Sequence, residues 1–400
     1  MAESLPRQRN EPGGEATPRL FTRRMLGLYL HIPFCRNKCP YCDFFSGPAS
    51  SAQLRAYPAQ LQRHLDWAGK HSWHGPVATI YFGGGTPSLL PPRAVGNLLA
   101  AVAQDFDLRS EVEITLEANP GTVTPKGLAG YRAAGVNRLS LGLQSLDPGQ
   151  LATLGRLHGR AEGEQAVHWA RQAGFTNLSL DLIFALPGQT LASLAAETDR
   201  YLELAPEHLS CYGLTAEPGT PFQQRLQAGA LTLPDGDFYA EAFLLLHERL
   251  SAAGYEHYEI ANYARHGYAC RHNLGYWERR PYLGVGAGAH SFRDEGWGER
   301  WAVPPDLDRY CRLVRQGQQP AELLESFDRR GAMSEALYLG LRTASGIDDA
   351  AFRARFGGSV AEAFPEAVIA LRPWLALTEG HWRMKVDGWL LYDRLIQTFL

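Results

Sequence analysis

Six short apolar segments alternate with helix-like segments along the first half of the chain, and this alternation limits the possible folds more than any other feature. The expected strands are 28–34, 77–82, 112–116, 138–143, 178–186 and 209–215. Between the first two expected strands, apolar residues recur at the spacing of one buried helix face, which predicts a helix there: Leu54, Tyr57, Leu61 and Leu65. Helices are also expected over 94–104, 126–134, 162–173 and 191–204. Strands joined by helices imply a parallel sheet, so we predict an α/β protein, and six units rather than eight predict an incomplete barrel.

The alternation weakens after about residue 220, and this change divides the chain. We predict a flexible leader at 1–26, a partial barrel at 27–220, an extension of the barrel at 221–329 and a small helical domain at 330–400. The extension contains a helical stretch at 238–252 and an irregular region at 265–305, whose length indicates a functional role. The last domain is expected to carry one short hairpin near 375–385.

The composition excludes several classes of protein. The net charge is −3, from 39 Lys and Arg residues against 42 Asp and Glu residues, so the overall charge predicts no nucleic-acid partner. No apolar run reaches the roughly 18 residues that a membrane-spanning helix requires, so we expect a protein that is not integral to a membrane. The leader contains acidic residues and no apolar core, which argues against a secretory signal.

Three of the six cysteines, Cys35, Cys39 and Cys42, directly follow the first expected strand. Three thiols so close together cannot all pair with one another, and a secreted disulfide framework spreads its cysteines along the chain. The pattern therefore favours a reducing, cytoplasmic compartment and a metal site. Three thiolates in a short loop suit a [4Fe–4S] cluster that keeps one iron open. Structural zinc, with His31 as a fourth ligand, is the alternative.

The cysteines have the spacing C-x3-C-x2-C, with YLHIPFC leading to the first of them and PYC ending at the third. This pattern resembles the radical S-adenosylmethionine (SAM) superfamily, and within it the oxygen-independent coproporphyrinogen III oxidase group, which includes the HemW-type heme chaperones. The resemblance extends from about residue 27 to the C-terminus and implies a six-unit partial barrel. It also implies that the open iron binds the amino and carboxylate groups of SAM, and that the reduced cluster cleaves SAM to a 5′-deoxyadenosyl radical.

Polar or small residues stand at the ends of the expected strands. A Gly-Gly-Gly-Thr-Pro turn at 83–87 follows the second strand, where missing side chains let a ligand approach the backbone. Because the C-terminal strand ends of a parallel barrel face one mouth, we expect the polar residues of later strands to converge there, although a helix cap or a satisfied buried group would explain each one alone. By resemblance, Gly84, Gly85, Thr86, Glu117, Gln144, Arg156, Asp181 and Thr215 bind SAM, and Tyr29 and Tyr41 line the cluster loop.

Two further features distinguish the branches of the family. The coproporphyrinogen oxidases carry a fourth cysteine two residues after the third, where this chain has Phe44. The segment HNLGYW at 272–277 resembles the H-N-x-x-Y-W motif of the HemW-type proteins. A neutral imidazole can ligate heme iron, and aromatic rings can hold a flat macrocycle. The expected heme-binding residues are His272, Asn273, Tyr276 and Trp277, and a packed aromatic cluster around one hydrogen-bonded histidine is the alternative.

The resemblance thus implies a heme chaperone that binds heme, a [4Fe–4S] cluster and SAM. Its expected partners are acceptor hemoproteins, membrane-associated respiratory proteins among them. The alternative function is that of a coproporphyrinogen III oxidase, which forms protoporphyrinogen IX by radical decarboxylation. The sequence leaves open whether the chain is an enzyme, and it assigns no catalytic residue.

Overall fold

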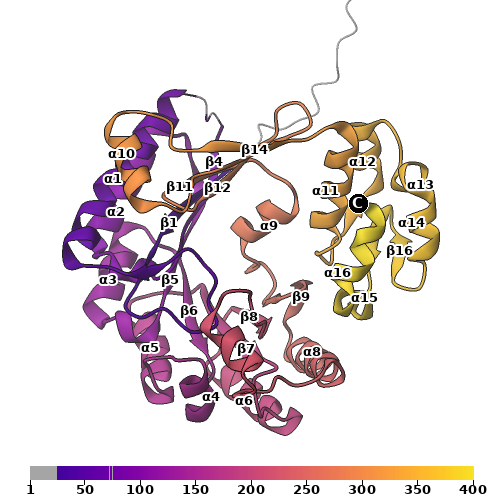
Figure 1. Ribbon diagram of the computed structural model, residues 1–400, viewed down its shortest axis with the longest axis horizontal. Helices are drawn as coiled ribbons and strands as arrows, with labels where there is room; N and C mark the ends of the chain where they lie inside the picture. The colour runs from indigo at the N-terminus through magenta and orange to yellow at the C-terminus, as the bar shows by residue number, and fades with distance from the viewer. Residues whose placement is uncertain (1–24, 72, 74) are drawn as a thin grey trace, which may run out of the picture.

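The computed structural model describes residues 25–71, 73 and 75–400, so the predicted leader at 1–26 lies almost entirely outside the described residues. These residues are built around a twelve-stranded sheet (Figure 1). Its centre consists of parallel strands in chain order, namely β1 (Leu26–Ile32), β4 (Val77–Gly84), β5 (Leu108–Ala118), β6 (Arg138–Gln144), β7 (Leu178–Phe184) and β8 (His208–Gly213). The predicted strands are confirmed with shifted ends, and the sheet is open, as the prediction of an incomplete α/β barrel requires.

Helices on the outside of the sheet connect these strands (Figure 1). The crossover helices are α1 (Ser51–His71), α2 (Pro92–Asp105), α3 (Pro125–Ala134), α5 (Arg160–Gln172) and α6 (Leu191–Glu203). Short turns of helix, η1 (Pro87–Leu89), η2 (Pro120–Thr122), α4 (Pro148–Thr153) and α7 (Pro221–Gln227), follow the carboxyl ends of strands. The hydroxyl of Thr124 accepts the N–H of Gly127 and so caps α3, as the hydroxyl of Thr190 caps α6 at Ser193.

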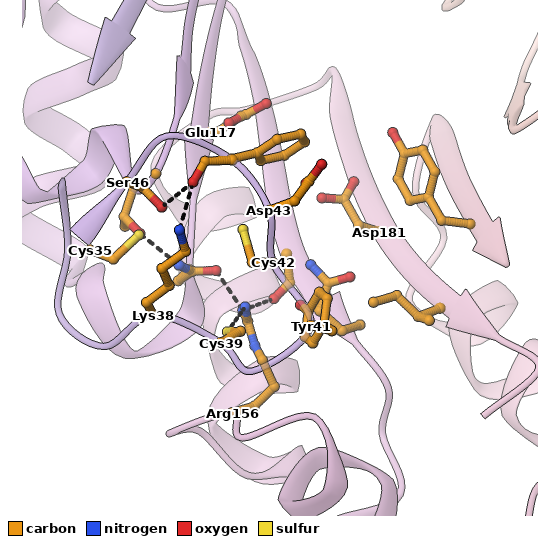
Figure 2. A pocket seen from close by; sticks show the side chains of 18 of the residues that line it. Cys35, Lys38, Cys39, Tyr41, Cys42, Asp43, Ser46, Glu117, Arg156 and Asp181 are labelled. Carbon is orange, nitrogen blue, oxygen red and sulfur yellow. Dashed lines mark hydrogen bonds between the residues drawn. The ribbon is translucent and has the colours of Figure 1, made fainter. Parts of the chain in front are cut away.

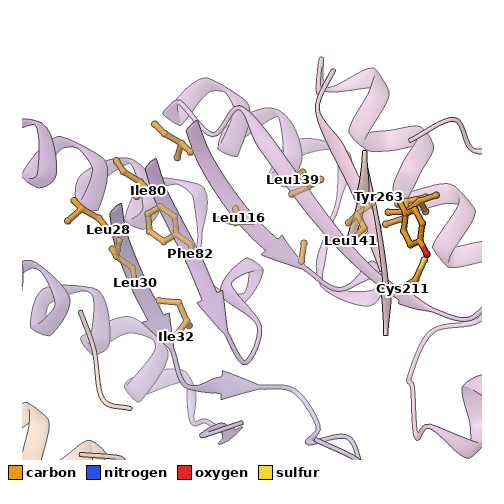
Figure 3. Packing of buried hydrophobic residues seen from close by; sticks show 14 of the residues in the cluster. Leu28, Leu30, Ile32, Ile80, Phe82, Leu116, Leu139, Leu141, Cys211 and Tyr263 are labelled. Carbon is orange, nitrogen blue, oxygen red and sulfur yellow. The ribbon is translucent and has the colours of Figure 1, made fainter. Parts of the chain in front are cut away.

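Successive side chains along a strand point to opposite faces of the sheet. The side chains that point toward the helices form the core. In β1, Leu28, Leu30 and Ile32 are fully buried and pack beside Ile80 and Phe82 of β4 (Figure 3). Each such side chain stabilises the fold by about 1.5–3 kcal/mol. The residues of β1 between them, Tyr29 and His31, face a cavity instead. The same strands therefore supply the core and the site.

Both edges of the central sheet are extended by segments far along the chain. At the edge beside β1, β11 (Tyr282–Val285) pairs in parallel with β1, and the sheet continues through the antiparallel strands β12 (His290–Arg293), β13 (Glu299–Ala302) and β14 (Glu322–Ser326). At the other edge, β10 (Asn262–Ala264) pairs with β8, and β9 (Glu256–Glu259) pairs with β10. The prediction of an irregular region at 265–305 was therefore wrong, since this region also contains α9 (Arg271–Trp277). The strands of this region are only four residues long and are separated by glycines in the left-handed conformation, such as Gly288. Such short strands show too little alternation of apolar and polar residues to be predicted from the sequence. The helix expected at 238–252 is confirmed as α8 (Gly236–Ala252), and α10 (Leu307–Arg315) packs on α1.

The C-terminal part is mostly helical, as predicted. Its helices are α11 (Arg329–Gly340), α12 (Asp349–Phe356), α13 (Val360–Ala363), α14 (Pro365–Ala370), α15 (Val386–Leu390), α16 (Tyr392–Leu395) and η3 (Ile396–Phe399), with a small sheet of β15 (Ile347–Asp348), β17 (His381–Met384) and β16 (Leu375–Thr378). β16 and β17 form the predicted hairpin. Figure 1 shows α9 between the central sheet and α11. Among the described helices, none combines the length and apolarity needed to span a bilayer. The exact domain boundaries stay predictions.

Candidate functional site

The cysteine loop is closed at its base and braced within. It leaves β1 through β2 (Phe34–Cys35) and returns through β3 (Gly47–Pro48), and these two short strands pair with each other. Inside the loop, the ammonium of Lys38 and the hydroxyl of Ser46 donate to the carbonyl oxygen of Phe44, at 3.0 and 3.3 Å (Figure 2). Its three cysteines are half-buried free thiols. The loop thus holds three unpaired thiols near the mouth of the barrel.

A cavity of about 510 Å³, which we call the cluster cavity, lies between this loop and the carboxyl ends of β4 to β8. Its walls include the three cysteines and every predicted SAM-binding residue: Cys35, Cys39, Cys42, Gly84, Gly85, Thr86, Glu117, Gln144, Arg156, Asp181 and Thr215, with Tyr41 of the loop. The expected convergence at one mouth is therefore observed. Tyr29, which was expected to line the cluster loop together with Tyr41, faces a neighbouring cavity instead.

That second space, also of about 510 Å³, is here called the aromatic cavity. Its aromatic lining comes from two distant regions of the chain and comprises Tyr29, Phe44, Phe45, Tyr276, Trp277 and Tyr282. His31, His290 and Arg300 also border it. Phe44, Gly84 and Glu117 line both cavities, so the two spaces adjoin.

A chain of donors connects two of the thiols across the floor of the cluster cavity. Arg156 donates to the sulfur of Cys39 at 3.6 Å and also to the side-chain oxygen of Asn119 (Figure 2). The amide of Asn119 donates to the Thr86 hydroxyl at 3.0 Å, which in turn donates to the sulfur of Cys35 at 3.6 Å. Donors aimed at sulfur favour the thiolate that a metal cluster requires. Asn119 is a site residue that the sequence analysis missed, although it stands just past the third strand, two residues after Glu117.

Two half-buried carboxyl groups face the cluster cavity. Glu117 accepts the Tyr81 hydroxyl at 2.7 Å and the backbone N–H of Gly84 at 3.2 Å, while Asp181 accepts the Ser140 hydroxyl at 3.1 Å. Burial raises the pKa of Glu117 to about 7 and the pKa of Asp181 to about 6. Desolvated carboxyls of this kind gain from a ligand that brings amino or hydroxyl donors to them.

Backbone geometry at the site depends on the glycine turn. A Cβ at position 85 would lie 2.6 Å from the carbonyl oxygen of Phe34 and 2.9 Å from the sulfur of Cys35. Gly84 has a φ of +112°, which L side chains rarely adopt. At the end of β6, Gln144 takes a φ of 67° where the register to β7 shifts, a conformation that is strained in a residue other than glycine. Glycine is therefore required at this turn because the cysteine loop and His31 pack directly against it.

The heme-motif residues divide between the cavity wall and the core behind it. Tyr276 and Trp277 line the aromatic cavity. His272 is buried behind Tyr276, where Nδ1 meets the Thr79 hydroxyl at 2.8 Å and Nε2 meets the Tyr276 hydroxyl at 2.8 Å. Asn273 lines neither cavity. Burial lowers the pKa of His272 to about 3, so its ring is neutral.

The start of α9 explains why His272 is fixed at this place. Glu113 of β5 accepts the backbone N–H groups of Arg271 and His272, at 3.2 and 3.1 Å, and so occupies the N-terminus of the helix. The ring of His272 also stacks on Tyr81, with 5.0 Å between ring centroids. The motif is thus anchored to the barrel by groups that the sequence analysis did not single out.

Comparison with known proteins decides the family. Residues 29–199 match the radical SAM superfamily and residues 327–391 match the HemN C-terminal domain. The chain is 36% identical over 382 residues to the heme chaperone HemW of Mycobacterium tuberculosis (strain H37Rv), which covers 94% of each chain. This chain belongs to the HemW family. The heme chaperone HemW of Escherichia coli K12 is 43% identical over 266 residues, covering 66% of this chain and 69% of that protein.

A solved structure supports the fold independently of the sequence relatives. Coproporphyrinogen III oxidase (HemN) from Escherichia coli superimposes with a TM-score of 0.81 over 94% of this chain and 90% of that chain, at 22% identity. At this identity the match establishes the radical SAM fold alone. Membership of the superfamily implies SAM and a [4Fe–4S] cluster.

The HemW-family chain has a donor set that suits a cluster better than a single metal ion. Within the described residues, no three His, Cys, Asp or Glu side chains converge as ligands of one ion. His31, the proposed fourth zinc ligand, uses Nδ1 toward the Tyr29 hydroxyl at 3.1 Å and Nε2 toward the Phe45 carbonyl at 2.9 Å. A cubane cluster instead binds each thiolate at a separate iron, so three thiols spread along one cavity wall suit it.

Proposed function

We propose that this HemW-family chain is a cytoplasmic heme chaperone, which binds heme in the aromatic cavity and delivers it to acceptor hemoproteins, including membrane-associated respiratory proteins. One observation carries the proposal: an aromatic-walled cavity of about 510 Å³ adjoins the cluster cavity through Phe44, Gly84 and Glu117. That volume is in the range of cavities that bury cofactor-sized ligands, about 300–1,000 Å³.

The walls of the aromatic cavity match the two chemical parts of heme. Rings such as those of Tyr276, Trp277 and Phe45 offer flat apolar contact to a macrocycle. The indole N–H of Trp277 is buried without a hydrogen-bond partner among the described residues, and Arg300 brings a guanidinium to the same cavity. The indole N–H suits the carboxylate of a propionate arm, whereas the guanidinium of Arg300 is already bonded to Glu335 and Tyr282 and contributes its positive charge to the cavity.

The cluster cavity has the residues to hold the other two groups. Cys35, Cys39 and Cys42 would bind three irons of a [4Fe–4S] cluster, and the remaining predicted residues of that cavity would bind SAM. When bound and reduced, the cluster supplies one electron toward SAM. Arg156 and Thr86 orient two of the sulfurs, and Glu117 accepts hydrogen bonds at the wall between the two cavities. We assign the cluster and SAM to the control of heme transfer.

Phe44 favours a chaperone over a decarboxylase. It occupies the position at which the coproporphyrinogen oxidases carry a fourth cysteine, the residue is 62% exposed, and it lines both cavities. An exposed phenyl ring between the cavities offers contact area to a flat ligand but no redox or acid–base chemistry.

The test is an anaerobic titration of the cluster-reconstituted full chain with ferric heme, followed by Soret absorbance, beside an assay for coproporphyrinogen III conversion with SAM and dithionite. We expect saturable, near-stoichiometric heme binding and no conversion. Trp277→Leu should weaken heme binding, whereas Tyr268→Leu, outside both cavities, should not. Conversion of coproporphyrinogen III without saturable heme binding would replace the proposal with the decarboxylase function.

A further inference from the structure

Three histidines stand at or behind the aromatic cavity, and they differ in what their ring nitrogens do. Both nitrogens of His31 are hydrogen-bonded, to the Tyr29 hydroxyl and to the Phe45 carbonyl. Both nitrogens of His272 are hydrogen-bonded as well, and its ring lies behind Tyr276 with only 3% exposure. An imidazole binds iron through a ring-nitrogen lone pair, so neither ring is free to do so without breaking its bonds.

The phenols that line the cavity are engaged in the same way. The hydroxyl of Tyr29 bonds to His31 at 3.1 Å, and that of Tyr276 bonds to His272 at 2.8 Å. The hydroxyl of Tyr282 accepts a hydrogen bond from Arg300 at 3.4 Å. Tyrosine is a known ligand of heme iron in other proteins, but these three oxygens already have partners.

His290 is different. It is the first residue of β12, it lines the aromatic cavity, and its side chain makes no hydrogen bond to any residue that the structure describes. Its backbone is held rigidly, because the strand pairs with β13 and because the carbonyl of His290 lies so close to Gly284 that a Cβ there would meet it at 2.0 Å. His290 is exposed at the cavity, and partial desolvation and the charge of the nearby Arg300 lower its pKa from the ordinary value, which favours the neutral ring that can bind a metal.

We infer that His290 is the residue of this chain that ligates heme iron, and that His272 is a positioning residue that holds Tyr276 at the cavity wall. The inference rests on the proposed heme binding and extends it to a second region of the chain, outside the motif at 272–277. A ring nitrogen of His290 would donate its lone pair to the iron and displace a water or chloride ligand, with no change in the oxidation state of the iron. The ligand class is an iron porphyrin with carboxylate arms.

The test compares ferric heme with metal-free protoporphyrin IX on the cluster-reconstituted full chain. His290→Ala should weaken ferric heme binding by about tenfold or more and shift the Soret and visible bands of the complex, and added imidazole should restore those bands. Protoporphyrin IX, which has no iron to ligate, should bind the wild type and His290→Ala alike. His272→Ala should lower the affinity for both porphyrins and keep the wild-type bands at saturation. His266→Ala, which removes a histidine with 95% side-chain exposure elsewhere on the chain, is the matched control and should change neither ligand's binding.

The outcomes separate this inference from the proposed function. If the wild type binds heme saturably and His290→Ala keeps its affinity and bands, the inference is wrong and the proposed function stands. Loss of the wild-type bands in His272→Ala, with their retention in His290→Ala, would assign the iron to His272. If the wild type binds neither porphyrin saturably, the proposed function fails together with the inference. His290→Gln, which keeps a polar side chain of similar size, repeats the comparison should the alanine variant lose its native far-ultraviolet circular dichroism.

Discussion

The hydroxyl of Tyr81 donates a 2.7 Å hydrogen bond to the carboxyl group of Glu117, across the neighbouring strands β4 and β5. Glu117 borders both cavities, so this pair stands at the wall between the expected cluster site and the expected heme site. Burial raises the pKa of Glu117 to about 7, although the hydrogen bonds from Tyr81 and Gly84 oppose the shift. A group at the junction of the two cavities therefore changes its charge near neutral pH.

This shift predicts a pH-dependent stability. The folded-state pKa of Glu117 lies above its ordinary value of 4.5, so the charged form destabilises the fold. The cost is absent below that value, grows between pH 4.5 and about 7, and is constant above. Glu117→Gln should therefore raise the free energy of unfolding by on the order of 2 kcal/mol at pH 8 and by close to zero at acid pH. Urea denaturation of the cluster-free protein at the two pH values measures the difference, and a gain that does not vary with pH would contradict the assignment.

We predict that replacing any one of the three loop cysteines removes the cluster but leaves the fold intact. Cys35→Ala, Cys39→Ala and Cys42→Ala should each abolish the brown absorbance after reconstitution and leave the circular dichroism near that of the wild type, because the thiols are half-buried and stand outside the apolar core. Cys311→Ala, which removes a half-buried thiol on α10, is the control and should keep its iron and sulfide. Full iron and sulfide content in any of the three loop variants would overturn the cluster site.

The glycine turn predicts a steric effect. Gly85→Ala should place a methyl group 2.6 Å from the Phe34 carbonyl and 2.9 Å from the Cys35 sulfur, where backbone cannot yield easily. We expect a loss of about 1–3 kcal/mol of stability and reduced cluster content. Gly121→Ala is the matched control, because nothing lies within 4 Å of its added Cβ. Iron analysis and thermal melts of both variants check the prediction, which fails if the two behave alike.

Because Arg156 is a predicted SAM-binding residue and Asn119 links it to Thr86, we predict that changes at the cavity floor weaken SAM binding while all three cysteine ligands stay in place. Arg156→Lys keeps the positive charge but loses the fork that reaches Cys39, Asn119 and the carbonyl of Gly142 together. Asn119→Ala breaks the link to Thr86. Each change should lower the affinity for SAM by about tenfold or more, as expected for hydrogen bonds to charged groups. Anaerobic calorimetry measures the affinity for SAM, with Arg132→Lys on α3 as the control. An unchanged affinity in both site variants would mean that these residues do not belong to the SAM site.

Much of the barrel could be predicted because its determinants are local. Each central strand is a short apolar run, and parallel topology alone brings Glu117, Asp181 and the cysteine loop to one mouth. Asn119 was missed because only its bonds to Arg156 and Thr86 distinguish it from an ordinary turn residue.

The aromatic cavity could not be predicted, because its walls come from residues far apart in the chain. Thr79 and His272 are 193 positions apart, and their 2.8 Å contact depends on how α9 packs on β4. The sequence motif suggested His272 as a heme-binding residue, whereas tertiary packing gives both of its ring nitrogens partners and leaves His290 at the cavity.

Heme delivery is the central claim, and the rate of transfer tests it most directly. The heme-loaded chain, freed of excess heme, is mixed anaerobically with the apo form of a b-type hemoprotein, whose own Soret band reports acceptance; heme-loaded serum albumin serves as a passive donor. If the chain hands heme over by contact, the transfer rate rises with acceptor concentration and exceeds that of albumin. A rate that is independent of acceptor concentration and no faster than that of albumin would mean simple release into solution, and would contradict the chaperone function.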